Sequence, residues 1–389
     1  MPTETGTLAD YFIPRKRPGE TGLPVLSVTM NDGLVPRESL DRRTESAMEA
    51  KAHSLVEPGD IAYNMMRMWQ GASGLCHIRA NISPAYVVMT PKANTDPAFA
   101  AHSLKSKDAI DLLWAYSHGL TEDRLRLYPD DFLSIPTTFP ALDDQRRIAA
   151  VLDTWDTALT IAERLVEAKR ARIASVAHRL LAKSSSSDVP LDEVAEINGR
   201  SLGTNTAPDF EFEYFPIGDD EGGGGWMCFK DAPSRARRTA LVGDVVYSTV
   251  RPLLRRIFRA PAHNSAVYST GYAVLSPREG HDAGYLFHCM TTHAFESQIL
   301  ARLTGSNYPA IGAKDLGELV VPACDLPRQR EIAAILDAAT AAHQSTEALV
   351  AKLREQKRGL MQQLLTGKVP MPESIDALLP PAPELVAAA

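Results

Sequence analysis

The stretch QRRIAAVLDTWDTA (Gln145–Ala158) returns nearly unchanged as QREIAAILDAATAA (Gln329–Ala342). After a shift of about 184 residues, both stretches share Gln, Arg, Ile, two Ala, Leu, Asp and the final Ala. The same shift places ERLVEAKRARIASVAHRLLA over EALVAKLREQKRGLMQQLLT without a gap. A repeat of this kind indicates that the chain consists of two halves with related structures.

Weaker matches keep the same order upstream of this repeat. GDIAYN at residues 59–64 matches GDVVYS at 243–248, and SPAYVVMTP at 83–91 matches STGYAVLSP at 269–277. Asp131-Phe132-Leu133 falls over Asp315-Leu316-Gly317. Each half therefore reads as a variable globular part followed by a long, better-matched segment.

In both long segments the apolar residues recur at steps of three and four, which indicates a helix with one apolar seam. A helix of roughly 38 residues is near 57 Å long at about 1.5 Å per residue. The sequence predicts two long antiparallel helices that form a coiled coil and space the globular domains. A helical hairpin that only holds the halves together is the alternative.

The globular parts contain short β-rich runs bounded by Gly, Pro and Asn, with a helical stretch around residues 98–116 and 282–303. The expected fold class is α+β with a pseudo-two-fold internal repeat. The expected parts are a first globular domain (1–140), a central spacer helix (141–182), a linker (183–190), a second globular domain (191–326), a C-terminal spacer helix (327–369) and a disordered tail (370–389).

Composition limits the possible functions. With 41 Lys and Arg against 48 Asp and Glu, the net charge of −7 argues against nonspecific coating of nucleic acid, so any nucleic-acid face must be local. The apolar runs are too short for a membrane span, and the first residues lack a signal-peptide pattern, so a cytoplasmic location is expected. The four cysteines form no CxxC pair, which favours reduced thiols over a zinc site.

Signatures of catalysis are missing from the sequence. It contains no GxxxxGK[ST] loop, no GxGxxG opening a helix, and no Asn/Asp-Pro-Pro-aromatic tetrapeptide of amino-methyltransferases. His288, Cys289 and His293 are close in sequence, but helical spacing does not converge them as ligands, so we interpret them as partly buried structural residues. We expect no catalytic residue and no metal site.

Residues suited to DNA recognition occur at matching places in the two halves. Arginine can read guanine edges, Asn and Gln can read adenine, and Trp can pack on a base or sugar. Each stretch alone is also compatible with a solvated loop or a core cluster, but recurrence at one register favours recognition. The candidates are Asn64, Arg67, Trp69, Gln70 and Arg124 in the first half, and Arg235, Arg251, Arg255, Arg256, Asn307 and Lys314 in the second.

The order of these parts resembles the specificity (S) subunit of type I restriction-modification systems. The resemblance covers nearly the whole chain. It rests on GDIAYNMMRMWQGASG (59–74) with SPAYVV, on the paired openings QRRIAAVLD and QREIAAILD, and on LMQQLLTGKV (360–369). The first helix departs from the family pattern because it ends in RLLAKSSSS, without Thr-Gly-Lys, and a Pro/Ala-rich tail extends beyond the second.

The resemblance implies a non-catalytic subunit whose two target-recognition domains each read one half of an interrupted, asymmetric site in double-stranded DNA. Its helices would act as a ruler and bind two methyltransferase (modification) subunits, and two restriction/translocase subunits would complete the complex. The partners would bring S-adenosylmethionine, ATP and Mg²⁺, with no cofactor in this chain. A 57 Å helix matches about 17 base pairs at roughly 3.4 Å each. The partner-binding residues of the helices would be Gln145, Arg146, Ile148, Leu152, Gln329, Arg330, Ile332 and Leu336. Of these, Ile148, Leu152, Ile332 and Leu336 are expected either in the core or facing partners.

Two other classes of function stay open at this point. A self-contained restriction enzyme would need methylase and nuclease motifs, which the sequence lacks. A coiled-coil adaptor that binds protein, or a degenerate specificity subunit that reads no DNA, would keep the helices without the recognition function.

Overall fold

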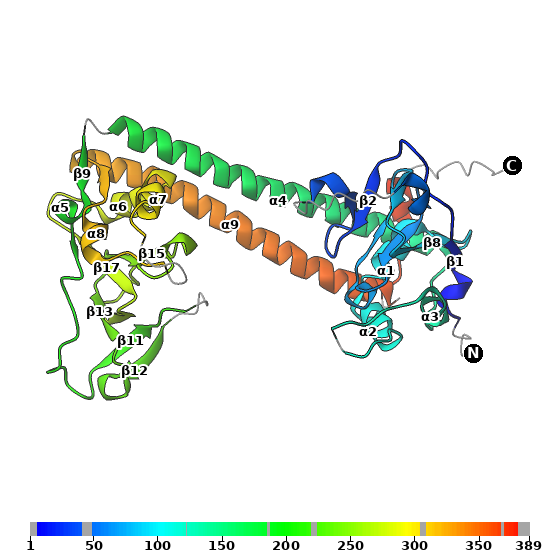
Figure 1. Ribbon diagram of the computed structural model, residues 1–389, viewed down its shortest axis with the longest axis horizontal. Coiled ribbons are helices and arrows are strands. Elements are labelled where there is room, and N and C mark those ends of the chain that lie inside the picture. The colour runs from blue at the N-terminus through cyan, green and yellow to red at the C-terminus, as the bar shows by residue number, and fades with distance from the viewer. Residues whose placement is uncertain are drawn as a thin grey trace. The chain divides into compact units, whose positions relative to one another are not determined.

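The computed structural model describes residues 6–40, 49–121, 123–184, 187–218, 224–303, 309–366 and 369–379 (Figure 1). The chain divides into two compact units: unit 1 comprises residues 1–162 and 349–389, and unit 2 comprises residues 163–348. Both divisions fall inside the long helices α4 (Leu142–Ser184) and α9 (Leu326–Leu365). Each unit therefore combines one globular part with a stretch of each helix, and the predicted pair of long helices is confirmed.

Unit 1 contains two four-stranded sheets. The first has the order β1-β8-β5-β6 with antiparallel pairs, and the second has the order β3-β2-β7-β4 with a parallel β2–β7 pair. The strands are β1 (Phe12–Arg15), β2 (Val25–Val28), β3 (Leu34–Pro36), β4 (Ser54–Val56), β5 (Ile61–Asn64), β6 (Ser73–Leu75), β7 (Ala80–Ile82) and β8 (Tyr86–Pro91). The helices are η1 (Leu8–Asp10), η2 (Arg37–Ser39), η3 (Ala50–Ala52), η4 (Met68–Gln70), α1 (Pro97–Ser103), α2 (Lys107–Ala115), α3 (Pro129–Ser134) and η7 (Glu373–Leu378).

Unit 2 repeats this plan with the orders β10-β17-β14-β15 and β12-β11-β16-β13, again with one parallel pair, β11–β16, and adds a β18–β9 pair. The strands are β9 (Asp188–Pro190), β10 (Ala195–Ile197), β11 (Glu211–Phe215), β12 (Gly225–Cys228), β13 (Ala236–Ala240), β14 (Val245–Ser248), β15 (Ile257–Arg259), β16 (Ala266–Ser269), β17 (Tyr272–Pro277) and β18 (Val320–Pro322). The helices are α5 (Leu191–Val194), η5 (Phe229–Asp231), η6 (Pro252–Leu254), α6 (Ala283–Met290), α7 (His293–Leu300) and α8 (Ala313–Gly317). The equivalent sheet orders confirm the internal repeat.

Each helical stretch expected from the sequence, around residues 98–116 and 282–303, is two helices: α1 and α2 in unit 1, and α6 and α7 in unit 2. In unit 1 the Ser106 side chain accepts the Ala109 backbone N–H and starts α2, and in unit 2 Thr292 does the same for Phe295 at the start of α7. A side-chain cap within the expected helix starts a new one, because it replaces the backbone acceptor of the preceding turn.

The long helices form one wall of each unit's core. In unit 1 Ile148 and Leu152 of α4 and Leu364 of α9 are buried in the same cluster as Phe99 and Phe132. In unit 2 a second buried cluster joins Leu181 of α4 and Leu336 of α9 to the helices and sheet of the globular part. The helices therefore belong to the folding units instead of serving as bare connectors.

Residues 371–379 differ from the disordered tail that the sequence predicts. The η7 helix forms here, and Met371 packs against the unit 1 core. Arg147 of α4 donates from Nε and Nη2 to both carboxylate oxygens of Asp376, at 2.6 and 2.8 Å, and these hydrogen bonds lower the pKa of Asp376. A bidentate ion pair orders a segment whose composition carries no packing pattern. Within the described ranges, no helix combines the length and apolarity that crossing a bilayer requires.

Candidate nucleic-acid interface

The most closely repeated surface feature is the turn between two strands of the first sheet in each unit. We name residues 65–72, between β5 and β6, tip 1, and residues 249–256, between β14 and β15, tip 2. Each tip contains one 3-10 turn at the same register, with Arg67 as N-cap of η4 and Arg251 as N-cap of η6. The first residue of each turn, Met68 or Pro252, is buried and anchors the tip.

A second segment lies beside each tip. The Leu127 N–H donates to the Met65 carbonyl oxygen at 2.9 Å in unit 1, and the Ile311 N–H donates to the Thr249 carbonyl oxygen at 2.9 Å in unit 2. The fold thus brings together two stretches that the sequence analysis selected separately, around Arg124 before Leu127 and around Lys314 after Ile311. Asn307 lies outside the described residues.

The four candidates of tip 1 divide into two pairs. Asn64 is half-buried and its Oδ1 accepts the Met66 N–H at 3.0 Å, while Trp69 Nε1 donates to the Met66 carbonyl oxygen at 3.1 Å. These two side chains shape the turn. Arg67 and Gln70 are exposed, and within the described part of the chain the Arg67 guanidinium has no ion-pair partner. Arg67 and Gln70 are therefore the side chains of tip 1 best placed to meet a ligand.

Arg124 and the basic residues around tip 2 have different surroundings. Arg124 is exposed, and its Nε lies 3.9 Å from Oδ2 of its neighbour Asp123. Arg235, Arg251 and Lys314 are also exposed, and Arg256 is half-buried.

Arg255 is held in a bidentate ion pair with Glu296 of α7, whose pKa is lowered to about 2 by hydrogen bonds from Arg255 and His293. The sequence shows a run of arginines with one nearby acid, Asp244, whereas the fold adds Glu296 and also Asp337, which binds Arg259. Arg255 is consequently engaged within the protein.

A buried carboxylate that the sequence analysis missed directly precedes each strand that leads into a tip, Asp60 before β5 and Asp244 before β14. Asp60 accepts the Thr90 hydroxyl at 2.7 Å and the Glu57 N–H at 2.9 Å, and Arg15 Nε lies 3.1 Å from it. Burial outweighs these partners and raises the pKa of Asp60. The repeated Gly-Asp pair at residues 59–60 and 243–244 was the available signal.

Asp244 has the equivalent set of partners in unit 2. It accepts the Leu241 N–H at 2.8 Å and pairs with Arg200, which also donates to the Ser276 hydroxyl. Both carboxylates therefore act as structural anchors for the hairpin that carries the tip.

Gln145 and Gln329, predicted to contact partners, are turned into their own units. Each is nearly fully buried. Gln145 Oε1 accepts the Asp96 N–H at the start of α1, and Gln329 Oε1 accepts the Asp282 N–H at the start of α6, both at 2.8 Å. Their amide groups donate to the carbonyl oxygens of Pro140 and Cys324, at 2.9 and 2.8 Å. Both side chains are therefore used inside their own units, and their contact with partner subunits stays a prediction.

The other residues of that prediction divide by burial. Ile148, Leu152, Ile332 and Leu336 lie in the cores, as one of the two predicted outcomes states, whereas Arg146 is half-buried and Arg330 is exposed. The large apolar side chains that α4 and α9 expose are different ones: Ile161, Leu165, Ile335 and Leu349, with exposed fractions between 42% and 62%.

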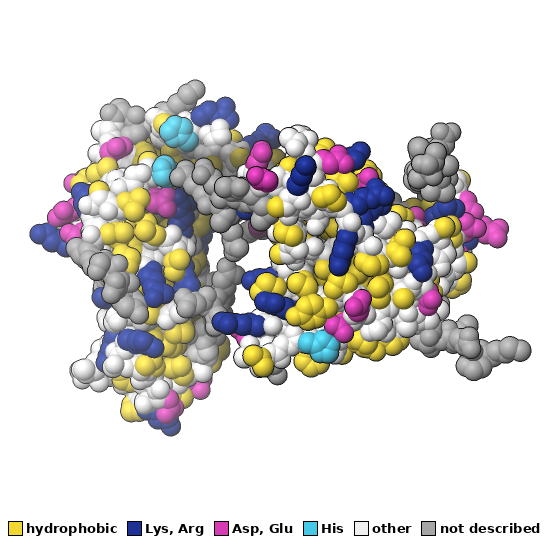
Figure 2. Space-filling view, turned by 45° about the vertical axis from the view of Figure 1, so that its right-hand side comes forward, with side chains coloured by type: hydrophobic (Ala, Val, Ile, Leu, Met, Phe, Trp, Pro, Cys, Tyr) yellow, Lys and Arg dark blue, Asp and Glu magenta, His cyan; other side chains and the backbone are white. Residues whose placement is uncertain are grey.

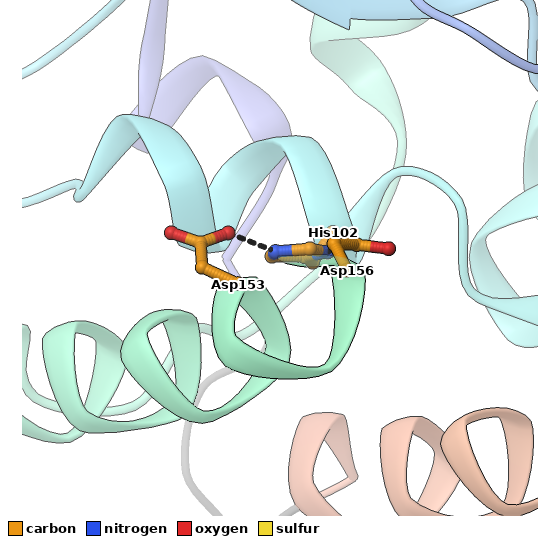
Figure 3. A group of neighbouring side chains, drawn as sticks. All are labelled: His102, Asp153 and Asp156. Carbon is orange, nitrogen blue, oxygen red and sulfur yellow. Dashed lines mark hydrogen bonds and ion pairs between the residues drawn. The ribbon is translucent and has the colours of Figure 1, made fainter. Parts of the chain in front are cut away.

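A repeated histidine–aspartate pair fastens the globular parts to the helices. His102 Nε2 lies 2.8 Å from Asp153 Oδ1 (Figure 3), and His288 Nε2 lies 2.7 Å from Asp337 Oδ1. With Asp156, the first pair offers three ligand atoms within 4.8 Å of one another, which fits the spacing of a metal site. The Lys357 ammonium group binds Asp156, however, and supplies the positive charge that these carboxylates need. We therefore assign the cluster a structural role.

The cavity in unit 1 between α2, residues 135–139 and the end of α9 has a volume of about 440 Å³. Its walls are mainly apolar, and Lys105 at its margin has a pKa lowered by burial.

Figure 2 shows Lys and Arg side chains interspersed with hydrophobic and acidic ones on the visible face, without one broad basic patch. This distribution agrees with the expectation of local basic patches.

Comparisons with known proteins were made for the whole chain. The S subunit of a type I restriction-modification system from M. genitalium matches with a TM-score of 0.57 and 16% identity, over 92% of this chain and 95% of that chain. The fold is that of a type I S subunit. A chain from a study of complex assembly and conformational transition of the type I R-M system matches with a TM-score of 0.57 and 19% identity, over 95% and 100%. No protein-family model and no curated protein matches the sequence.

The two globular parts present equivalent hairpin tips with different sequences, and Asp60 and Asp244 hold the opposite ends of the strands that lead into these tips.

Proposed function

We propose that this chain is the non-catalytic DNA-specificity subunit of a type I restriction-modification complex. Tip 1 and tip 2, each with its adjoining segment, would read the two halves of an interrupted site in double-stranded DNA. The observation that carries the proposal is the duplicated tip, built on one anchored backbone but exposing different side chains in a chain with the S-subunit fold.

The difference between the tips supports an asymmetric target. Tip 1 exposes Arg67 and Gln70, which can form hydrogen bonds with purine edges. Tip 2 exposes Arg251 together with Leu253 and Leu254. Because one chain carries both readers, binding of the first half-site makes the second encounter intramolecular, so two weak contacts can suffice in an acidic protein.

We further propose that α4 and α9 pair as an antiparallel coiled coil. In unit 2 Lys169 Nζ donates to the Thr346 hydroxyl at 2.6 Å, while Leu181, further along α4, shares a core with Ile332, which lies earlier in α9. In unit 1 Asp156 of α4 binds Lys357 of α9. Opposite directions along the two helices are what an antiparallel pair requires.

The exposed apolar side chains of these helices would dock the partner subunits. Ile161 and Leu349 in unit 1, and Leu165 and Ile335 in unit 2, leave apolar surface for helices of two methyltransferase subunits. Those subunits would bring S-adenosylmethionine, and two restriction/translocase subunits would bring ATP and Mg²⁺ chemistry.

The proposal is tested by single-molecule methylation sequencing of DNA from a strain that expresses this chain with a methyltransferase encoded beside it. A strain without the chain is the control. An interrupted two-part adenine-methylation motif that requires the chain is the expected result. If no motif depends on the chain, the assignment as a DNA reader fails, and a protein-binding adaptor or a degenerate specificity subunit takes its place.

Single residues can then be assigned to half-sites. Arg67→Ala should weaken binding at one half-site alone, by about 1–3 kcal/mol if the guanidinium contacts a base. Arg79→Ala is a matched control, because Arg79 is exposed in the same unit but paired with Glu20. Equal loss on all DNA sequences would make Arg67 a phosphate contact.

A further inference from the structure

Tip 2 exposes two adjacent leucines where tip 1 carries Trp69 and Gln70. Leu253 is 41% exposed and Leu254 is 53% exposed. Both belong to η6, whose register in the hairpin is that of η4 in unit 1. A single exposed leucine is common on protein surfaces and needs no explanation. Two adjacent exposed leucines at the positions of the DNA-binding candidates Trp69 and Gln70 call for one.

The backbone of tip 2 is held rigidly. Pro252 is buried, the Arg251 N–H donates to the Pro309 carbonyl oxygen at 2.8 Å, and the Arg255 N–H donates to the Pro252 carbonyl oxygen at 3.0 Å. Arg251 and Arg255 both have left-handed backbone conformations, with φ of 50° and 52°. Such conformations are unfavourable for residues other than glycine and persist where the surroundings impose them.

The ion pair of Arg255 explains how this conformation is maintained. In tip 1 the residue at the equivalent place is Gly71, with φ of 87°, which adopts the left-handed region without strain. In tip 2 the Arg255 side chain reaches Glu296 of α7 instead. Arg255 therefore stabilises the turn, and the leucines project from a fixed support.

We propose that Leu253 and Leu254 are specificity-determining residues that pack against the C5-methyl group of a thymine in the major groove. The inference rests on the proposed function. Apolar side chains recognise thymine through this methyl group, which no other DNA base carries. The exposed Arg251 beside the leucines and Arg235 and Lys314 elsewhere in the unit complement the charge of a DNA backbone.

The inference predicts that the two half-sites are read by different chemistry. Tip 1 would read its half-site through polar groups, and tip 2 would require at least one thymine, on either strand, within its half-site. A thymine replaced by deoxyuridine loses only the methyl group and keeps every hydrogen-bonding atom, so the replacement isolates the proposed contact.

The test uses the full chain bound to its methyltransferase subunits and duplexes carrying the motif found by methylation sequencing. Each thymine is replaced in turn by deoxyuridine, and binding is followed by fluorescence anisotropy. The wild type should lose about fourfold in affinity at one position of one half-site, the factor expected for burying one methyl group. Leu253→Ala/Leu254→Ala should bind thymine and deoxyuridine duplexes equally. Leu300→Ala, also exposed and apolar in unit 2, should retain the difference.

The outcomes separate this inference from the proposed function. If no two-part motif exists, the proposed function fails. If a motif exists but the double variant keeps the wild-type response to deoxyuridine, the inference about the leucines is overturned while the proposed function stands. The inference is overturned in the same way if the double variant loses affinity equally for all duplexes, including those without the motif. An unchanged melting temperature of the double variant excludes misfolding as the cause.

Discussion

The attachments of the two globular parts to the long helices differ less than the tips do. In unit 1 Gln145 and the His102–Asp153 pair join the globular part to α4, and in unit 2 Gln329 and the His288–Asp337 pair join it to α9. The hydrogen-bond lengths agree within 0.1 Å. The best-matched stretch of the sequence therefore encodes the attachment of a globular part to its helix.

The surroundings of the two pairs are where the copies diverge. Near His102, Asp156 adds a second carboxylate, which Lys357 of α9 neutralises. In unit 2 Arg259 of β15 binds Asp337 directly, at 2.6 and 3.0 Å, and lies over the Phe287 ring. The histidine–aspartate hydrogen bond is therefore kept in both copies, whereas the cation near the carboxylates comes from a different element in each copy: α9 in unit 1 and β15 in unit 2.

Substitutions that create cavities in the two cores should cause the largest loss of stability. Leu152→Ala and Leu336→Ala each remove a fully buried side chain from an equivalent place and should lower the free energy of unfolding by about 2–5 kcal/mol. Chemical denaturation of the full chain measures both. Ile335→Ala, exposed and adjacent to Leu336, should change it by less than about 0.5 kcal/mol. A large decrease in the free energy of unfolding for only one of the two variants would show that the two cores are not equivalent.

Replacing the buried glutamines should cause the next largest loss of stability. Gln145→Leu and Gln329→Leu leave the Asp96 and Asp282 N–H groups without their acceptors, at a cost of about 1–3 kcal/mol each. Hydrogen exchange should accelerate at the start of α1 in the first variant and of α6 in the second. Arg330→Ala, on the exposed side of the same helix turn, should leave α6 unchanged. Unaltered exchange in either glutamine variant would contradict the attachment role.

A pH dependence should distinguish unit 2. Burial lowers the pKa of His288 and outweighs the hydrogen bond to Asp337, with Arg259 and Asp282 also facing it. Because the folded pKa lies below the unfolded value of about 6.5, this contribution to stability is complete above that pH and is lost as the pH falls through the folded pKa.

The corresponding measurement is the exchange rate of α6 amides between about pH 5 and 7.5, corrected for intrinsic exchange. His288→Asn should flatten the dependence below about pH 6.5. An equally steep dependence in the variant would show that another group titrates there.

The charge partners should give the smallest effects. Lys357→Met removes the cation beside Asp156, and Arg259→Met removes the one beside Asp337. Each pair has a substantially exposed acid, so we expect losses below about 1 kcal/mol. Arg259→Met should cost more than Lys357→Met, because Arg259 also contacts Phe287. Thermal denaturation at low and high salt checks the order, and the reverse order would show that the helix-to-helix contact matters more.

Much of the fold follows from sequence patterns. The strands at residues 86–91 and 272–277 and both long helices lie where alternation and heptad spacing predict them. The split of each expected helix was missed, although Ser106 and Thr292 are typical capping residues. A cap is visible in sequence only when the surrounding apolar pattern also breaks.

The candidate interface was less predictable. Arg67 is exposed on tip 1, and its contact with DNA stays a prediction. No residue near Arg255 in the sequence indicates its ion-pair partner Glu296, which lies 41 residues away. Gln145 and Gln329 lie in the first turns of α4 and α9, where the sequence pattern is the same whether the side chain points outward or inward. The direction of these two side chains is decided only when α1 and α6 pack against the long helices.

By itself, the sequence determined the duplication, the two long helices and a few of the strands, because these depend on the spacing of apolar residues along a short stretch of chain. Only the tertiary structure decided which arginines stay exposed, which glutamines become buried clamps, and that the leucines of tip 2 project from a rigid turn. These properties depend on ion pairs and hydrogen bonds between residues far apart in sequence, whose partners are chosen by packing.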